Sequence, residues 1–323
     1  MPPPPPVRGA YRTDARARAA YAEGAGIYRI LPEAISRPTD VEDLKILIAW
    51  ASEHRIPLVP RGAGSAMAGG NVGSGVVVDL TGMAGRRLEI DPVRRRAVTT
   101  AAVTLAELAA ATMPFGLRLP PDPSSGQWAT LGGMVSTNAA GARSVRYGSV
   151  RRWVEAVTLV TAEGESVRLA RKPAGRIPAN GWVGSGAAGQ DHSVTTERFH
   201  RDGAPRIRAA STLISDRFPR TRKNSSGYAL DAYLASGDVL DLIIGAEGTL
   251  GIVTEIEWGL DAVPAFRAGL RVHLSSLVHL GDVVGALSQW EPSAQELLDR
   301  SFLDLLGEDR LSGAGLRAGT EAI

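Results

Sequence analysis

The feature that most constrains this chain is a stretch of small residues between two apolar segments, Val59–Asn71, which reads VPRGAGSAMAGGN. Five of its thirteen residues are Gly or Pro, and most of the others are small. A loop with so few side chains lets another group approach its backbone closely. Two interpretations stay open from these residues alone. Either main-chain N–H groups converge on an anion, or a tight turn between strands needs positive φ at several glycines.

The stretch does not have the composition of an ATP-hydrolysing phosphate loop. Gly64 and Gly69 have the spacing of that motif, but Gly70 and Asn71 stand where it carries lysine and then serine or threonine. Without the lysine, no side chain of the loop reaches a terminal phosphate. If an anion binds here, a pyrophosphate that is held intact suits the loop best.

The segments around the loop predict an α+β fold. In chain order we expect a helix capped by Thr39 or Asp40, buried strands at 56–60 and 75–80, a hairpin at 88–103, a helix capped by Thr104, a hairpin around Glu163–Gly164, and a helix, glycine-rich turn and strand within 238–264. No helix separates the two strands that flank the loop, whereas a dinucleotide-binding βαβ unit requires one. The pattern therefore excludes that fold.

Two further glycine patterns differ in what they indicate. Gly184–Gly189 has the G-x-G-x-x-G spacing, but no strand precedes it and no apolar helix follows, so we interpret it as a flexible loop. Thr130–Gly141 and Gly245–Glu255 each contain a hydroxyl residue followed by Leu and Gly, an arrangement that lets the chain pass close to a flat ligand. In this order, after the first loop, the two segments favour a nucleotide-like ligand.

Composition excludes several classes of site. The chain has 323 residues, no cysteine, five histidines without metal-ligand spacing, and a net charge of +2. We therefore expect no disulfide, no metal site and no nucleic-acid partner. No apolar run has the length of a membrane span and no secretory signal begins the chain, so we expect a cytoplasmic protein.

The length favours more than one domain. We expect a disordered or extended proline-rich lead over 1–25, a main domain over 26–265 with an exposed polar insertion at about 171–206, and a second domain over 266–323 that is cut short. In the second domain, 268–290 predicts a strand followed by a helix, and 293–306 predicts an amphipathic helix.

Together these motifs resemble the FAD-binding PCMH-type domain of the vanillyl-alcohol oxidase / p-cresol methylhydroxylase superfamily, in the branch of D-lactate dehydrogenases and GlcD-like glycolate oxidases. The resemblance covers about residues 20–265 and rests on PRGAGSAMAGGNVGSGVVVDLTGM, PPDPSSGQWATLGGMVSTNAAGARSVRYG, KNSSGYAL and IIGAEGTLGIVTE. It implies a two-subdomain FAD-binding fold followed by the incomplete start of an α/β cap domain.

The resemblance also implies a set of FAD-binding residues. By position in the motifs these are Arg61, Gly62, Ala63, Gly64, Ser65, Ala66, Met67, Pro121, Asp122, Pro123, Ser124, Thr130, Gly132, Gly133, Ser136, Asn138, Ala139, Gly141, Tyr147, Glu247, Gly248, Ile252, Val253 and Thr254. Lys223 and Asn224 occupy further motif positions near the cofactor. No histidine lies in residues 61–70, where related proteins with a tethered flavin often carry one, so the FAD is expected to be noncovalent.

By the same resemblance the chain is a FAD-dependent dehydrogenase or oxidase acting on CH–OH groups. The substrate is a 2-hydroxy acid of the D-lactate, glycolate or D-2-hydroxyglutarate type, a hydride passes from its C2 to flavin N5, and an unidentified electron acceptor reoxidises the flavin. The family's cap, its His-rich metal motif and its histidine base are expected past Ile323. Oxidation of a sugar lactone or alcohol, and a flavin-binding or partner-binding fragment without turnover, stay open, as does a partner subunit.

Overall fold

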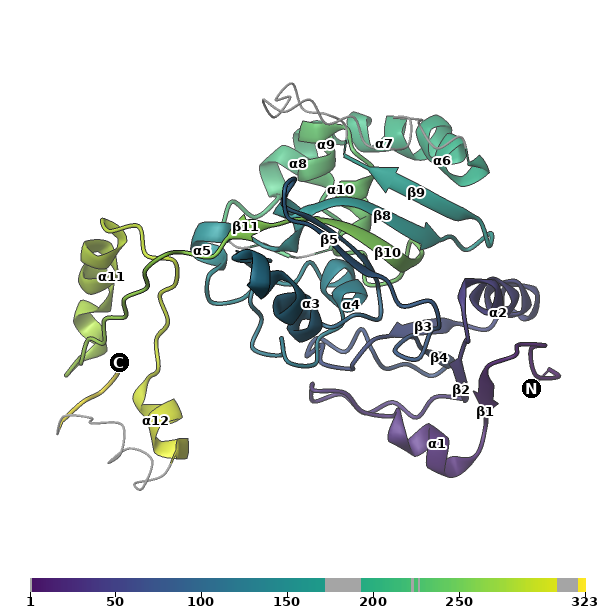
Figure 1. The fold of residues 1–323 in the computed structure, drawn as a ribbon, viewed down its shortest axis with the longest axis horizontal. Helices are drawn as coiled ribbons and strands as arrows, with labels where there is room; N and C mark the ends of the chain where they lie inside the picture. Colours follow the sequence, from purple (N-terminus) through teal and green to yellow (C-terminus); the bar gives the residue numbers. More distant parts are fainter. Residues whose placement is uncertain (1, 172–192, 222–223, 226, 307–318) are drawn as a thin grey trace.

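Nine of the eleven strands in the described residues form a mixed four-stranded sheet and an antiparallel five-stranded sheet, with helices packed against both (Figure 1). This computed structural model describes residues 2–171, 193–221, 224–225, 227–306 and 319–323. The mixture of helices and strands confirms the predicted α+β class. We refer to the described residues of 2–263 as the two-sheet body and to those of 264–323 as the C-terminal segment.

The four-stranded sheet has the order β1–β2–β4–β3. Its strands are β1 (Ala10–Arg12), β2 (Ala34–Arg37), β3 (Leu58–Arg61) and β4 (Val76–Asp79). β4 is buried along its whole length, as its run of valines predicts. β3 was expected to be buried, but it is only half-buried, because it lies at the edge of the sheet and has a neighbouring strand on one side alone.

Helix α2 (Val41–His54) covers this sheet, and its two ends lie at capping residues. The Asp40 side chain accepts a hydrogen bond from the Asp43 N–H, and Arg55 ends the helix in a left-handed conformation. Leu44 and Leu47 lie on the buried face and pack with Val76 and other residues of the sheet.

The connection between β3 and β4 excludes one of the two interpretations of the sequence, the tight turn between strands. The two strands are parallel, so residues 62–75 must bring the chain back to the beginning of the next strand, and they do so without a helix. A tight turn cannot make that connection. Residues 62–71, the glycine loop from here on, therefore run outside both sheets.

The five-stranded sheet is antiparallel and has the order β5–β6–β10–β8–β9. Its strands are β5 (Leu88–Asp91), β6 (Arg96–Thr100), β8 (Val154–Val160), β9 (Ser166–Ala170) and β10 (Ile252–Gly259). The pairs β5–β6 and β8–β9 are the two hairpins that the sequence predicts, and β10 lies between them.

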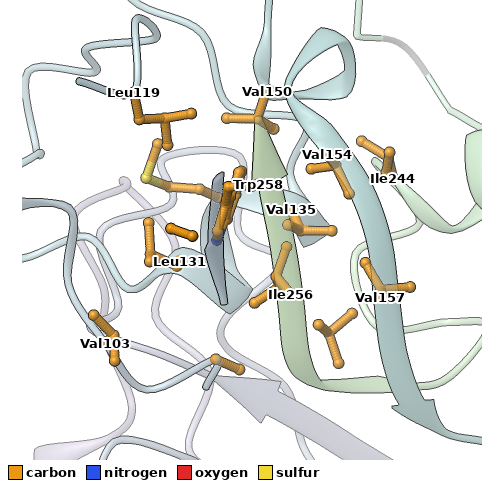
Figure 2. Close-up of a cluster of buried hydrophobic side chains, with 14 of the residues drawn as sticks. Val103, Leu119, Leu131, Val135, Val150, Val154, Val157, Ile244, Ile256 and Trp258 are labelled. Carbon is orange, nitrogen blue, oxygen red and sulfur yellow. The ribbon is translucent and has the colours of Figure 1, made fainter. Parts of the chain in front are cut away.

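The largest core lies between this sheet and the helices α3 (Leu105–Thr112), α4 (Leu131–Ser136) and α10 (Leu240–Ile243). Trp258 is its largest fully buried side chain and stands among Leu131, Val135 and Ile256 (Figure 2). Helix α3 begins with a complete capping box formed by Thr104 and Glu107, as predicted.

Short elements complete the two-sheet body. They are α1 (Ala15–Ala20), η1 (Met113–Phe115), β7 (Leu117–Arg118), α5 (Ser144–Tyr147), η2 (Val150–Arg152), α6 (Val194–Arg198), the π-helical η3 (Phe199–Gly203), α7 (Ala204–Ala209), α8 (Ser211–Arg217), α9 (Leu230–Ser236) and β11 (Asp261–Ala262), which pairs with β7. Of the expected polar insertion, residues 172–192 lie outside the described residues, and so does the Gly184–Gly189 pattern. The part from Ser193 onward is helical and buries Ala204 against Tyr233 and Leu242, so this part is not simply exposed.

The described part of the proline-rich lead is ordered, so of the two alternatives predicted for it, disordered or extended, disorder is not found in residues 2–25. Residues 10–12 pair with β2 as strand β1, and Trp50 Nε1 donates to the Pro3 carbonyl at 2.9 Å. The Asp43 carboxylate accepts main-chain hydrogen bonds from Arg8 and Gly9 at 2.9 and 2.8 Å. These long-range partners on α2 fix the lead, and proline content alone does not reveal them.

The C-terminal segment lies apart from both sheets (Figure 1). It contains η4 (Leu277–His279), α11 (Leu280–Ser288) and α12 (Arg300–Leu306), which is shorter than predicted. In place of the predicted strand, Leu274 makes one isolated bridge with Ala322. No strand of the described ranges runs beside that stretch, so it has no ladder to join there. Where one domain ends and the other begins stays a prediction.

Candidate functional site

Three segments that are far apart in sequence enclose a cavity of about 600 Å³, which is within the usual size range for small-molecule sites. The glycine loop forms one wall, residues around α4 form a second, and the turn before β10 forms a third. The lining is dominated by Gly, Ala and Ser, so much of the wall is main chain. Such a wall suits a ligand that lies along the backbone.

The glycine loop offers main-chain donors to this cavity. In the part of the chain that the structure describes, the N–H groups of residues 62–71 have no protein acceptor. The loop is held instead through its carbonyls: the Ala25 N–H donates to Gly64 O at 3.0 Å, and Asn71 Nδ2 donates to Ala66 O at 3.2 Å. Nine of these ten residues line the cavity, and free N–H groups beside a cavity are the donors that an anion requires.

Arg61 brings a positive charge to the start of the loop. Its Nη1 donates to the carbonyls of Tyr21 and Asn71 at 3.4 and 3.3 Å, and its guanidinium lies over the Tyr21 ring. Among the described residues no carboxylate pairs with it within 4 Å. Burial lowers the pKa of Arg61, although the side chain stays charged, as arginine does in proteins.

Tyr21 and Asp79 form a hydrogen-bonded pair next to Arg61. The Tyr21 hydroxyl donates to Asp79 Oδ2 at 2.5 Å, and Asp79 also pairs with Arg37 Nε at 3.1 Å. Burial, together with the hydrogen bond and charge of Asp79, raises the pKa of Tyr21 to about 12. The tyrosine therefore stays a neutral donor at physiological pH and positions the base of the loop.

The second wall is set by how α4 begins. Thr130 caps the helix by accepting from the Gly133 N–H at 3.3 Å, and the Gly132 N–H donates to Ala101 O at 2.9 Å. Two positions near this helix start leave no room for a side chain, so glycine is needed at both. A Cβ at Gly62 would lie 2.1 Å from Thr130 Oγ1, and one at Gly132 would lie 2.5 Å from Ala101 Cβ.

The third wall is the turn that leads into β10. The N–H groups of Gly245 and Glu247 donate to the carbonyls of Val135 and Ser136 at 3.0 and 2.9 Å, which ties this turn to α4. Glu247 has φ of +52°, in the left-handed region that few residues other than glycine adopt. The cost of that conformation is of order 1 kcal/mol or more.

Seventeen of the 24 residues proposed from the sequence line this one cavity. They are Arg61, Gly62, Ala63, Gly64, Ser65, Ala66, Met67, Pro123, Thr130, Gly132, Gly133, Ser136, Ala139, Glu247, Gly248, Ile252 and Val253. The structure thus brings together residues separated by up to about 190 positions of sequence. That they bind FAD stays a prediction.

Seven of the proposed residues do not line the cavity: Pro121, Asp122, Ser124, Asn138, Gly141, Tyr147 and Thr254. Thr254 Oγ1 donates instead to Thr158 O in β8 at 3.2 Å, and the Tyr147 ring lies under the Arg118 guanidinium. Asp122 pairs with Arg143 at 2.7 Å. Asn138 and Asn224 line a smaller cavity of about 200 Å³, whereas Lys223 lies outside the described residues.

Sequence reasoning missed several lining residues, including Ala101, Ala102 and Ala129. Alanine carries no distinctive chemistry, so only its position after a predicted strand could have suggested it. The support that the 21–28 segment gives to the glycine loop was missed as well. A Cβ at Gly26 would lie 2.3 Å from Met67 O, which shows how closely the two backbones pack.

The described residues contain no group of three or more His, Asp or Glu side chains that could hold a metal ion. None of the helices in the described ranges has both the length and the apolar character needed to cross a membrane.

Comparison with known proteins defines the class. Residues 32–170 match the family model of the FAD binding domain. This part of the chain therefore belongs to the PCMH-type FAD-binding domains. The chain is 27% identical over 290 residues to D-2-hydroxyglutarate dehydrogenase of Escherichia coli, a match that covers 88% of this chain and 28% of that protein.

Two other curated relatives support this relationship. The chain is 29% identical to D-lactate dehydrogenase of Anaerostipes hadrus, over 84% of this chain and 46% of that protein. It is 34% identical to glycolate oxidase subunit GlcD of Bacillus subtilis, over 49% of this chain and 35% of that protein. The chain thus spans between about a quarter and a half of the length of these relatives.

Solved structures share the fold. Alkyldihydroxyacetonephosphate synthase superposes with a TM-score of 0.58 at 19% identity, over 91% of this chain and 46% of that one. 6-Hydroxy-D-nicotine oxidase from Arthrobacter nicotinovorans superposes with a TM-score of 0.53 at 18% identity, over 81% of this chain and 44% of that one. The described residues have the fold of the FAD-binding portion of these enzymes.

Proposed function

We propose that this chain binds FAD noncovalently in the 600 Å³ cavity, with the glycine loop holding the pyrophosphate. The observation that carries the proposal is the run of free main-chain N–H groups at residues 62–71. The charge of Arg61 at the start of the loop, which no carboxylate among the described residues pairs with within 4 Å, adds to the attraction for a diphosphate. The small residues along α4 leave room for an extended ligand beside the helix.

Noncovalent attachment is supported by the chemistry of the wall. No histidine, cysteine or tyrosine occurs among the described residues that line the cavity, so none offers a nucleophile of the kind that tethers a flavin. Denaturation in acid is therefore expected to release the bound FAD quantitatively into the supernatant. Flavin that stays with the precipitated polypeptide would contradict this part of the proposal.

We further propose that the chain belongs to a dehydrogenase or oxidase of 2-hydroxy acids. The names of the relatives, D-2-hydroxyglutarate dehydrogenase, D-lactate dehydrogenase and GlcD, support this substrate class. FAD, when bound, supplies the hydride-accepting centre of such a reaction. The described residues bind and orient that group: the loop donates N–H groups, Arg61 balances charge, and Thr130 and Ser136 bring hydroxyls to the wall.

A binding experiment tests the cofactor. The purified chain is titrated with FAD by isothermal calorimetry, beside the variants Gly62→Ala and Gly269→Ala. The first variant places a Cβ 2.1 Å from Thr130 Oγ1, whereas a Cβ at Gly269 meets nothing within 4 Å. We expect Gly62→Ala to weaken FAD at least tenfold and Gly269→Ala to bind as the wild type does. A wild-type chain that cannot take up FAD would overturn the proposed function.

A second experiment tests the substrate class. The FAD-loaded chain is mixed without oxygen with D-lactate, glycolate and D-2-hydroxyglutarate, and the flavin absorbance is followed. Bleaching by one of these acids is the expected result for a 2-hydroxy-acid dehydrogenase. Bound flavin that none of them bleaches would support a FAD-binding fragment without turnover, or oxidation of a sugar lactone or alcohol. The fragment is a real alternative because the chain spans less than half of the length of these relatives.

A further inference from the structure

Met67 is an exposed methionine in the middle of the glycine loop. It is 74% exposed, and it lines the cavity of about 600 Å³. Of the other methionines that the structure describes, Met134 is buried and Met83 is half-buried, whereas Met113 is 62% exposed in η1 and does not line the cavity. Within the described ranges, Met67 is therefore the methionine that is both open to solvent and part of the proposed site.

The sulfur of an exposed methionine is where a peroxide attacks a chain of this composition. The chain has no cysteine and five methionines, so thioethers are its only sulfur groups. In the reaction the O–O bond of hydrogen peroxide breaks, one oxygen binds the sulfur to form a sulfoxide, and the other leaves as water with both protons. The sulfur is oxidised by two electrons and the peroxide is reduced. Exposed thioethers react first, because the oxidant must reach them.

The glycine loop is a place where this change has consequences, because its donors are free. The N–H groups of residues 62–71 have no acceptor among the described residues. A thioether is a weak acceptor, whereas a sulfoxide is polar, and its oxygen lies four bonds beyond Cα, within reach of neighbouring N–H groups. An N–H group that binds this oxygen is lost to an anion. The oxygen also brings partial negative charge beside the place where the anion binds.

The backbone of Met67 is held in place, so an altered side chain stays beside the cavity. A Cβ added at Gly26 would lie 2.3 Å from Met67 O and 3.3 Å from Met67 Cα, so the two chain segments are in direct contact. The Ala25 N–H donates to Gly64 O at 3.0 Å and ties the same segment to the loop. The loop therefore does not swing aside to carry an oxidised side chain away from the cavity.

We propose that Met67 is a site of methionine oxidation, and that its conversion to the sulfoxide by hydrogen peroxide weakens FAD binding. The effect on FAD rests on the proposed function. An oxidase that passes its electrons to dioxygen releases hydrogen peroxide, so an enzyme of the proposed class produces this oxidant close to its own cofactor site. Methionine sulfoxide reductases reverse the change, which makes the loss of FAD affinity reversible.

The test exposes the purified full chain to hydrogen peroxide before titration with FAD, beside the variants Met67→Leu and Met113→Leu. Peptide mass spectrometry shows which methionines gain an oxygen atom, calorimetry gives the Kd of FAD, and thermal unfolding shows whether the fold survives. Each protein is compared with itself before and after oxidation, so an effect of leucine alone on affinity cancels. Part of each sample is then treated with methionine sulfoxide reductases.

We expect oxidation to weaken FAD about fivefold or more in wild type and in Met113→Leu, the factor that corresponds to one neutral hydrogen bond. Met67→Leu should keep its own Kd after the same treatment, and the reductases should restore the Kd of wild type. The unfolding temperature of oxidised wild type should not fall, since Met67 is exposed. Without any oxidant, Met67→Gln should bind FAD more weakly than Met67→Leu, because its amide oxygen has a similar reach.

Three results would overturn the inference and leave the proposed function standing. The first is a wild-type chain that carries the sulfoxide at Met67 and binds FAD with unchanged affinity. The second is a loss of affinity in Met67→Leu as large as in wild type, because another methionine then responds. The third is a Met67 that gains no oxygen under conditions that oxidise Met113. A wild-type chain that binds no FAD before oxidation overturns the proposed function, and the inference with it.

Discussion

The two-sheet body and the C-terminal segment both contain helices with apolar residues, but they bury these residues to very different extents. Helix α2 in the body buries Leu44, Leu47 and Ile48 among other residues, whereas α11 in the C-terminal segment buries no residue although most of its residues are apolar. In the described part of the C-terminal segment only Leu303, Thr320 and Ala322 are buried. A helix with an apolar face is thus stabilised by what packs against it, and the sequence of the helix does not supply that partner.

This contrast places the cavity in the part of the molecule that has its own core. All residues that line it belong to the two-sheet body. The walls are connected by hydrogen bonds between main-chain atoms that are distant in sequence, such as Gly245 N to Val135 O. We therefore expect substitutions in the body to change both stability and FAD binding, and matched substitutions in the C-terminal segment to change neither by much.

The largest difference is expected between two tryptophans. Trp258 is fully buried and its Nε1 donates to Thr99 Oγ1 at 2.9 Å, whereas Trp290 is 76% exposed. Trp258→Ala should lower the free energy of unfolding by about 3–5 kcal/mol, because it leaves a cavity in the core. Trp290→Ala should change it by less than about 0.5 kcal/mol.

Urea denaturation followed by circular dichroism measures both values. If Trp258→Ala does not fold, Ile256→Val deletes one methyl group from the same core and should cost about 1 kcal/mol. Similar losses for the two tryptophan variants would show that the C-terminal segment has a buried core of its own in solution.

The parts of the fold that the sequence predicts well are those fixed by local interactions. Asp40 and Thr104 cap the helices α2 and α3 as expected, and both hairpins form where their turns predict. A cap or a turn is satisfied by residues three or four positions away, so its signal is present in the sequence itself.

The parts that the sequence does not predict depend on distant partners. The parallel pairing of β3 with β4, the order in the proline-rich lead and the absence of a strand near Leu274 all depend on which elements become neighbours. The site shows the same division. Its glycine loop was recognisable, whereas Ala101 and Ala102 enter the cavity only because β10 places the end of β6 beside α4.

A second comparison concerns two arginine–aspartate pairs. Arg151 is largely buried, pairs with Asp241 Oδ1 at 3.2 Å, and also donates to the carbonyls of Asp241 and Ile244. Arg300 pairs with Asp304 on the exposed surface of α12. Arg151→Met should cost about 3 kcal/mol, because it leaves buried oxygens without donors. Arg300→Met should cost at most about 0.5 kcal/mol.

FAD affinity separates these variants further. The Ile244 carbonyl precedes the turn that carries Glu247 into the cavity, so Arg151→Met should also weaken FAD, measured by calorimetry at a temperature where the variant is folded. The Arg300 variant should bind FAD as wild type does. Unchanged FAD affinity in a destabilised Arg151 variant would show that the turn keeps its position without this contact.

A third comparison concerns two aspartates that bind main-chain N–H groups. Asp43 accepts from Arg8, Gly9 and Thr39, all within 3 Å, whereas the one donor to Asp299 among the described residues is the Phe302 N–H. An amide in place of the Asp43 carboxylate turns a donor toward these N–H groups, so Asp43→Asn should cost about 2–3 kcal/mol. Asp299→Asn should cost less than about 1 kcal/mol, as for other caps.

The contacts of the Asp43 carboxylate also predict that stability depends on pH. Burial alone would raise the pKa of Asp43, but hydrogen bonds from the N–H groups of Arg8, Thr39 and Gly9 outweigh it and hold the pKa well below the ordinary value of 3.8. The carboxylate therefore stabilises the fold fully above about pH 4, and this stability is lost as the pH falls through the lower folded value. Thermal unfolding between pH 7 and pH 2 should show a steeper decline for wild type than for Asp43→Asn.

The smallest and most specific difference is expected between two helical glycines. In α4 a Cβ at Gly132 would lie 2.5 Å from Ala101 Cβ and 3.2 Å from Ala101 O, so α4 or the end of β6 must move. In α11 a Cβ at Gly285 meets nothing within 4 Å. Gly132→Ala should therefore lower stability by about 1–2 kcal/mol and weaken FAD. Gly285→Ala should raise stability by up to about 1 kcal/mol, because alanine favours the helix.

The opposite signs make this pair informative, since both substitutions add the same methyl group to a helix. Urea denaturation and FAD titration of the two variants give the comparison directly. A loss of stability in Gly285→Ala would mean that another surface lies against α11 in solution, because in the described residues nothing there is close enough to clash. The face of α11 that lies open here would then be an interface, and the C-terminal segment would depend on a partner for its burial.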